Sequence, residues 1–244
     1  MSRNNKRGYE LTADKLQKYL EAALNNSHQL TEESSHLMDG GFYARSYFLS
    51  VAAIEEAGKS YLAFLGKSRK LIDPAVQSKL KKNFEDHQLK TLMAFIPWME
   101  AESRASLDLE PMFERANYLI SGRELSMYVD FEQISGDITC PSNLVGVEQA
   151  KQCLSIACKV KQAVESAVSV RNNPVFSDTG NQFYLMKTKE LTEVVDSEDF
   201  QNFLLHELSA HPKPPFDLAT CIGKFRQNRN APNTGGANAD MPIE

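Results

Sequence analysis

A short polar stretch, KKNFEDHQLK, holds the residues best suited to acid–base chemistry: Lys82, Asn83, His87 and Lys90. On a helix, His87 and Lys90 are three residues apart and face the same way. A histidine can move a proton during cleavage of a phosphodiester, while a neighbouring cation stabilises the negative charge that develops. The same residues also fit an exposed polar helix face with local salt bridges, and both interpretations stay open.

A second candidate set lies in VAAIEEAGKS, an apolar stretch interrupted by Glu55, Glu56, Gly58 and Lys59. Successive helical residues are about 100° apart around the axis, which puts Gly58 on the apolar stripe, where a missing side chain lets another helix approach. Glu55 falls at the edge of this stripe, one turn before Lys59, and Glu56 points nearly opposite. Either Glu55 and Lys59 form a surface i,i+4 ion pair and Glu56 is solvated, or Glu55 and Lys59 edge a polar pocket that faces His87.

A third set, in GRELSMYVDF, comprises Arg123, Tyr128 and Asp130, where a helix ends and a long loop begins. Tyr128 fits a half-buried side chain with its hydroxyl bonded, and Asp130 fits a cap or turn residue. The alternative is that all three point into the same pocket as Glu55.

No metal or cofactor is expected. The histidines are scattered, and none pairs with another at the four-residue spacing that places two ligands on one helix face. Neither a G-x-G-x-x-G sequence nor a Walker A loop occurs, so nucleotide hydrolysis has no motif to support it.

Helices must position these side chains. Apolar residues at spacings of three and four predict helices over 13–38, 42–70 and 147–171, the first capped by Thr12 and ended by Gly40 and Gly41. Asp73 and Pro74 start a further helix that reaches the neighbourhood of Pro97.

Three weaker patterns complete the chain. A helix is predicted from about Glu110, with Gly122 as a break or close-packing point. The segment from Tyr128 to Val145 is rich in Gly, Pro, Ser and Asp and predicts a long loop with a short extended piece. Ser197 is expected to cap a last helix that runs to about Ala210.

Composition limits the class of protein. The net charge of −5 does not indicate a broad surface for binding nucleic acid. No apolar run is long enough for a transmembrane helix, and the N-terminus does not resemble a secretory signal. Four cysteines without a CxxC pair suit a reducing cytoplasm, and Cys153 and Cys158 are expected to be small core residues.

In order, ARSYFLSVAAIEEAGKS, HQLK and GRELSMYVDF resemble the AbiV family of bacterial abortive-infection proteins, over roughly residues 13–171. The resemblance implies a cytoplasmic phage-defence protein that halts gene expression, and kinship with HEPN domains, which are all-α bundles that often dimerise and include many RNases. HEPN RNases typically use an arginine, a polar residue and a histidine a few positions later. The nearest match here runs from Lys82 through Asn83 to His87, and lysine keeps the charge of arginine but not its bidentate geometry.

We therefore expect an all-α, HEPN-like helical bundle over residues 10–172, a helical extension over 173–226 and a disordered tail over 227–244. The favoured function is an effector that binds or cleaves RNA, as a homodimer and without a membrane. Candidate catalytic residues are His87, Lys82, Glu55 and Lys59, and candidate substrate-binding residues are Lys90, Asn83, Glu56, Arg123, Tyr128 and Asp130. The alternatives are a non-catalytic sensor of a phage protein or nucleotide, and a purely structural motif.

Overall fold

The described part of the chain is helical apart from one small sheet. The computed structural model describes residues 9–103, 118–119, 121–132, 134–170, 186, 190, 193–194, 197–210 and 218–230. The predicted all-α class is confirmed. The chain divides into two compact units, Met1–Ser177 and Asp178–Glu244. Among the described helices, none is long and apolar enough to cross a membrane.

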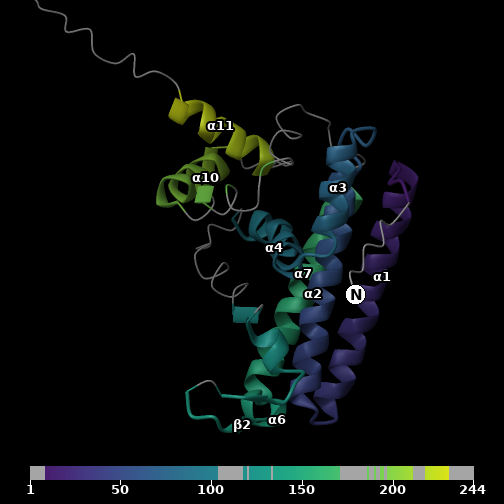
Figure 1. Cartoon of the computed structure of the whole chain (residues 1–244), viewed down its shortest axis with the longest axis vertical. Coiled ribbons are helices and arrows are strands. Elements are labelled where there is room, and N and C mark those ends of the chain that lie inside the picture. Colours follow the sequence, from purple (N-terminus) through teal and green to yellow (C-terminus); the bar gives the residue numbers. More distant parts are fainter. Residues whose placement is uncertain are drawn as a thin grey trace, which may run out of the picture. The chain divides into compact units, whose positions relative to one another are not determined.

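Three long helices lie side by side in the first unit: α1 (Ala13–Asp39), α2 (Tyr43–Gly66) and α7 (Val147–Val170) (Figure 1). Thr12 Oγ1 accepts the amide of Lys15, which confirms the predicted cap of α1. Gly41 turns the chain into α2 with a φ of 77°, in the region that favours glycine. The predicted cores of all three helices are correct, although α2 ends four residues before residue 70.

Helix α2 is buried on nearly every side because α1, α4 and α7 all pack against it. The apolar stripe predicted on this helix is therefore only part of its buried surface. Small polar residues let α1 approach closely: Ser27 donates to the carbonyl of Ala53 at 2.7 Å, and Ser34 donates to that of Ser46 at 2.8 Å. Each buried hydroxyl is thus satisfied by a backbone acceptor on the neighbouring helix.

The single helix predicted from Asp73 towards Pro97 is wrong. It is divided into α3 (Pro74–Asn83) and α4 (His87–Ser103), and Pro97 lies inside α4. Asp86 Oδ1 accepts the amide of Leu89 at 3.0 Å, which caps α4 and makes His87 its first residue.

Two glycines set how closely other segments approach α2. A Cβ atom at Gly58 would lie 1.8 Å from the carbonyl oxygen of Lys90 in α4, so only glycine permits this contact. A Cβ atom at Gly122 would lie 2.4 Å from the hydroxyl of Tyr47 in α2, so the helical segment 121–125 also packs closely. Both close approaches expected from the sequence are confirmed.

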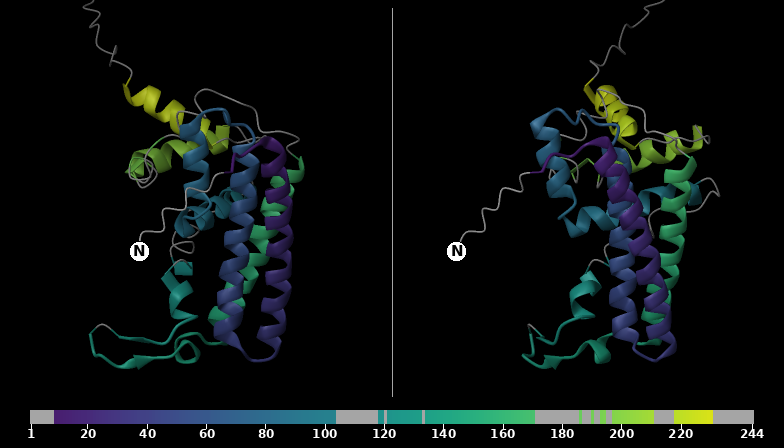
Figure 2. Two further views of the ribbon diagram at one scale, coloured as in Figure 1. Left: turned by 45° about the vertical axis from the view of Figure 1, so that its right-hand side comes forward. Right: turned by 90° about the vertical axis from the view of Figure 1, so that its right-hand side faces the viewer.

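The expected loop contains a hairpin. Strands β1 (Asp130–Phe131) and β2 (Ile138–Thr139) pair antiparallel, with Phe131 opposite Ile138, and α6 (Pro141–Leu144) follows. Figure 2 shows the hairpin extending away from the long helices at one end of the first unit. The helix predicted from Glu110 begins outside the described residues, and 118–119 and 121–125 are helical.

The second unit contains α10 (Glu198–Ala210) and α11 (Leu218–Asn230). Ser197 Oγ accepts the amide of Phe200 at 3.3 Å, as expected of a cap. Helix α11 was not predicted, and the expected boundary between 226 and 227 falls inside it. The small core of this unit comprises Met186, Phe200, Leu204, Cys221, Ile222 and Phe225.

The two cysteines of α7 differ in environment, which corrects the expectation that both are core residues. Cys153 is fully buried, and burial raises the pKa of its thiol above the usual range. Cys158 is exposed. Side chains five residues apart on a helix point in directions about 140° apart around its axis, so Cys153 and Cys158 cannot both lie on one core face.

We predict that Gly58→Ala lowers the free energy of unfolding by about 1–3 kcal/mol, because the added methyl group meets backbone that cannot rotate away. Gly66→Ala is the matched control in the same helix, since its nearest neighbour is the flexible end of Leu80 at 2.9 Å. Denaturant unfolding of both variants checks this. Equal stability of the two would contradict the close contact between α2 and α4.

The cysteine environments predict selective alkylation. In the folded protein iodoacetamide should modify Cys158 and leave Cys153 unmodified, because thiolate reactivity requires both access and ionisation. In denaturant both should react. Mass spectrometry of peptides from α7 measures each site, and early modification of Cys153 would show that α7 does not pack as described.

Candidate functional site

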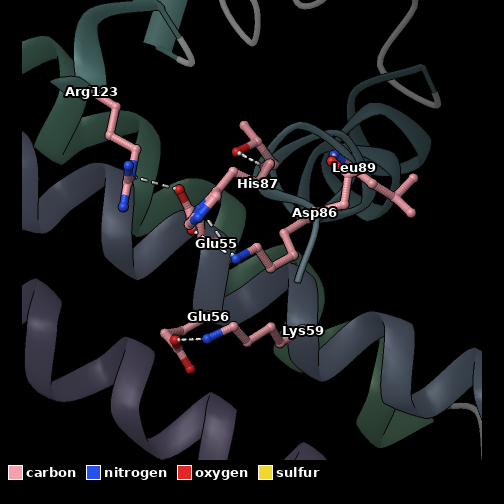
Figure 3. Close-up of polar contacts among 9 residues, drawn as sticks. Glu55, Glu56, Lys59, Asp86, His87, Leu89 and Arg123 are labelled. Carbon is pink, nitrogen blue, oxygen red and sulfur yellow. Dashed lines mark hydrogen bonds and ion pairs between the residues drawn. The ribbon is translucent and has the colours of Figure 1, made fainter. Parts of the chain in front are cut away.

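A buried carboxylate, that of Glu55, brings together the candidate residues of three segments (Figure 3). Glu55 Oε2 lies 2.7 Å from His87 Nδ1 and 3.1 Å from Lys90 Nζ, and Oε1 lies 3.0 Å from Arg123 Nε. We call Glu55, His87, Lys90 and Arg123 the Glu55 cluster. It joins α2, the start of α4 and the helical segment 121–125.

Exposure divides the Glu55 cluster into an inner and an outer part. The side chains of Lys90 and Glu55 are 4% and 8% exposed, whereas those of Arg123 and His87 are 24% and 53% exposed. Lys90 therefore neutralises Glu55 from within the protein. Only His87 and Arg123 present substantial surface to a ligand from solution.

Hydrogen-bond chemistry assigns the tautomer of His87. Its Nδ1 atom is 2.7 Å from a carboxylate oxygen, which only accepts, and 3.2 Å from the ammonium of Lys90, which only donates. The shorter contact requires that Nδ1 carries a proton and donates it to Glu55. With Nδ1 protonated, Lys90 contacts Glu55 through charge, as an ion pair of 3.1 Å between Nζ and Oε2. In the neutral ring, Nε2 is left as the proton acceptor on a half-exposed side chain.

Arg123 is positioned by packing on α2. Its guanidinium lies over the ring of Phe48, with 5.7 Å between Cζ and the ring centroid, and the neighbouring Gly122 contacts Tyr47. Arg123 Nε and Glu55 Oε1 form an ion pair, but the N–H is not aligned with the oxygen, and neither atom has a hydrogen-bond partner among the described residues. The arginine therefore approaches Glu55 mainly through charge.

Positive charge exceeds negative charge in the Glu55 cluster. One carboxylate faces the cations of Lys90 and Arg123, with the imidazole of His87 beside them. The N-terminus of α4 begins at His87, and the carboxylate of Asp86 that caps it offsets its partial positive charge. The exposed side of the cluster is therefore suited to an anion such as a phosphate.

Glu56 and Lys59 lie apart from this cluster. They form an ion pair with each other on a different side of α2 (Figure 3), so the expected pairing of Glu55 with Lys59 is wrong. Glu56 is half-buried rather than solvated. Burial, together with the nearby charge of Glu56, raises the pKa of Tyr19 in α1 to about 12.

The remaining candidates occupy other positions. Lys82 is exposed on α3 and Asn83 is buried at the end of that helix. Tyr128 is 56% exposed. Asp130 belongs to β1, where its Oδ1 accepts the amide of Phe131 at 2.8 Å. Within the described part of the chain, no hydrogen bond or ion pair joins Lys82, Tyr128 or Asp130 to the Glu55 cluster.

Comparison with known proteins gives one match. Residues 15–162, which include the whole Glu55 cluster, match the HEPN-type family model described as AbiV. No curated protein and no solved structure matches the chain.

We predict that Glu55→Gln lowers the free energy of unfolding by about 3–5 kcal/mol, because it leaves the buried ammonium of Lys90 without its counter-charge. Glu56→Gln is the matched control. It should cost less than Glu55→Gln, because the Lys59 side chain is 22% exposed and keeps more contact with water than that of Lys90. Chemical denaturation of both variants measures the difference, and similar losses would mean that Glu55 is not the central counter-charge.

Proposed function

The chain belongs to the AbiV family, and we propose that it is a cytoplasmic effector that shuts down gene expression by acting on RNA. Family membership indicates abortive-infection phage defence. The observation that supports RNA as the target is the contact of 2.7 Å between Glu55 and a half-exposed His87, beside the guanidinium of Arg123. A carboxylate, an imidazole and a cation supply the acid–base and charge-stabilising groups that phosphodiester cleavage uses.

In the proposed reaction, His87 Nε2 takes the proton of a ribose 2′-hydroxyl, whose oxygen attacks the adjacent phosphorus. The bond from phosphorus to the 5′-oxygen breaks, and the proton passes from His87 to that oxygen. The products are a 2′,3′-cyclic phosphate and a 5′-hydroxyl end. Glu55 accepts a hydrogen bond from Nδ1–H throughout and stabilises the imidazolium, while the proton stays on the ring. Arg123 stabilises the charge on the non-bridging oxygens.

Arg123 takes the role that the sequence pattern assigned to Lys82. Its guanidinium can bind two phosphate oxygens at once, which an ammonium cannot. Its ion pair with Glu55, 3.0 Å between Nε and Oε1, places it next to the partner of His87. Lys82 is exposed on the separate helix α3, which favours a weaker, general attraction of RNA.

We also propose that the active form is a homodimer. One imidazole must otherwise take the proton from the nucleophile and return it to the leaving group in turn. The half-exposed His87 of a second copy would let two histidines divide these steps.

The second candidate function is a non-catalytic sensor that binds a phage protein or a nucleotide. The net charge of −5 favours it, because an acidic protein gains little from the non-specific attraction that brings RNA to its binders. In this case the Glu55 cluster holds the helices together and its exposed side binds an anionic group of the ligand.

Total cellular RNA tests the catalytic proposal. Purified wild-type protein should release fragments with 2′,3′-cyclic phosphate ends, and His87→Ala should lower the rate about 10²–10⁴-fold while the protein stays folded. Arg123→Lys should also lower it, because the bidentate contact is lost. Lys82→Ala should retain most activity.

His36→Ala is the matched control, since His36 is an exposed histidine of α1 outside the Glu55 cluster. Across the wild type and these variants, the level of phage protection in cells should correlate with the rate of RNA cleavage. Equal cleavage by wild type and His87→Ala would contradict the mechanism. Protection by the wild type without any cleavage would favour the sensor.

A further inference from the structure

The hairpin carries apolar side chains that the first unit does not cover. Val129, Phe131, Ile134 and Ile138 are 63%, 67%, 95% and 65% exposed. We call these four residues the hairpin surface. A contiguous exposed apolar patch of this kind marks an interaction site more often than a scattered apolar residue does.

The strand register gathers three of these residues on one face, and Ile134 lies in the turn between the strands. Phe131 is opposite Ile138, and Val129 lies on the same face two residues before Phe131. Asp130 and Thr139 form the neighbouring pair and point to the other face. An antiparallel sheet with one apolar and one polar face normally packs its apolar face on another layer. Two strands alone are too few to supply that layer themselves.

The turn holds this surface in a defined form. The carboxylate of Glu132 accepts the amides of Ile134 at 3.1 Å and Ser135 at 2.5 Å, and Gly136 has a φ of 74°. Outside the strands, the amide of Glu132 also donates to the carbonyl of Asp137 at 2.8 Å. A preorganised surface loses less conformational entropy on binding than a flexible loop.

Charge identifies the kind of partner. The segment 124–150 contains no lysine or arginine and five acidic residues: Glu124, Asp130, Glu132, Asp137 and Glu148. The five negative charges of this segment equal the net charge of −5 of the whole chain. The acidic residues outside the segment are therefore equal in number to the 27 lysines and arginines. Three of these five, Asp130, Glu132 and Asp137, belong to the hairpin itself, which therefore carries a local negative charge. It repels RNA, and it repels the same segment of a second copy.

We propose that the hairpin surface docks a partner protein whose apolar contact region is surrounded by lysine or arginine side chains. The apolar face supplies the buried centre of the interface, and the negative charge of the hairpin attracts the basic side chains around the partner's contact region. Chemical complementarity therefore selects a basic protein surface. This interaction goes beyond the proposed RNA chemistry and does not depend on it, because no residue of the Glu55 cluster belongs to the hairpin surface.

Site-specific photocrosslinking tests the proposal. A benzophenone amino acid is placed at position 134 in the full chain, in infected and uninfected cells. Position 72 is the matched control, since Ile72 is an apolar residue outside the hairpin and is 82% exposed. We expect one protein adduct at position 134 that is absent at position 72, identified by mass spectrometry of the crosslinked peptide.

The identified protein is then purified and titrated against the wild-type chain. Ile134→Ser together with Ile138→Ser should weaken binding at least about tenfold, whereas Ile72→Ser should not, and rising salt should weaken it further. RNA cleavage by the double variant should match the wild type, which separates this proposal from the catalytic one. Adducts only with RNA or with a second copy, no adduct at position 134, or binding that ignores salt or the double substitution would overturn the proposal.

Discussion

The buried carboxylate of Glu55 is the constraint on which the first unit depends. A carboxylate whose side chain is 8% exposed needs counter-charges, and α2 itself supplies none, because Lys59 pairs with Glu56 instead. The cations come from α4 and from the helical segment 121–125, two regions distant in sequence. The cost of removing these charges from water is offset only when they meet. Formation of the Glu55 cluster therefore depends on correct packing of α2, α4 and the helical segment 121–125.

Steric fit lets this pairing occur. Gly58 lies against the backbone of Lys90, and its missing side chain lets Lys90 reach Glu55. Gly122 lies against the ring of Tyr47, and its missing side chain lets the next residue, Arg123, reach Glu55. The cap formed by Asp86 then starts α4 at His87. As a result, the imidazole stands at the end of a helix, half-exposed, while Lys90 one turn later is buried. The exposed acid–base group and the buried counter-charge thus follow from one helix start.

Much of the fold, and part of the candidate site, was predictable from local patterns. Helical periodicity located α1, α2 and α7, and the apolar stripe correctly made Gly58 a contact point. The break before His87 was missed because the helix signal continues through Asp86, although an aspartate three residues before Leu89 is a cap signal. The partner of Lys59 was also missed, since i,i+3 and i,i+4 pairs compete and tertiary packing decides between them. Arg123 was a candidate, but only the tertiary structure separates it from Tyr128 and Asp130.

The central claim for the Glu55 cluster is that Glu55 fixes the orientation and tautomer of His87. Two-bond ¹H–¹⁵N correlation spectra of the histidine rings test it directly, at a pH where the imidazoles are neutral, with the signal assigned by its loss in His87→Gln. We expect a protonated Nδ1 and an unprotonated Nε2 for His87. A spectrum with the proton on Nε2 would mean that Nδ1 accepts from Lys90 and that Glu55 does not hold the ring, which would contradict the claim.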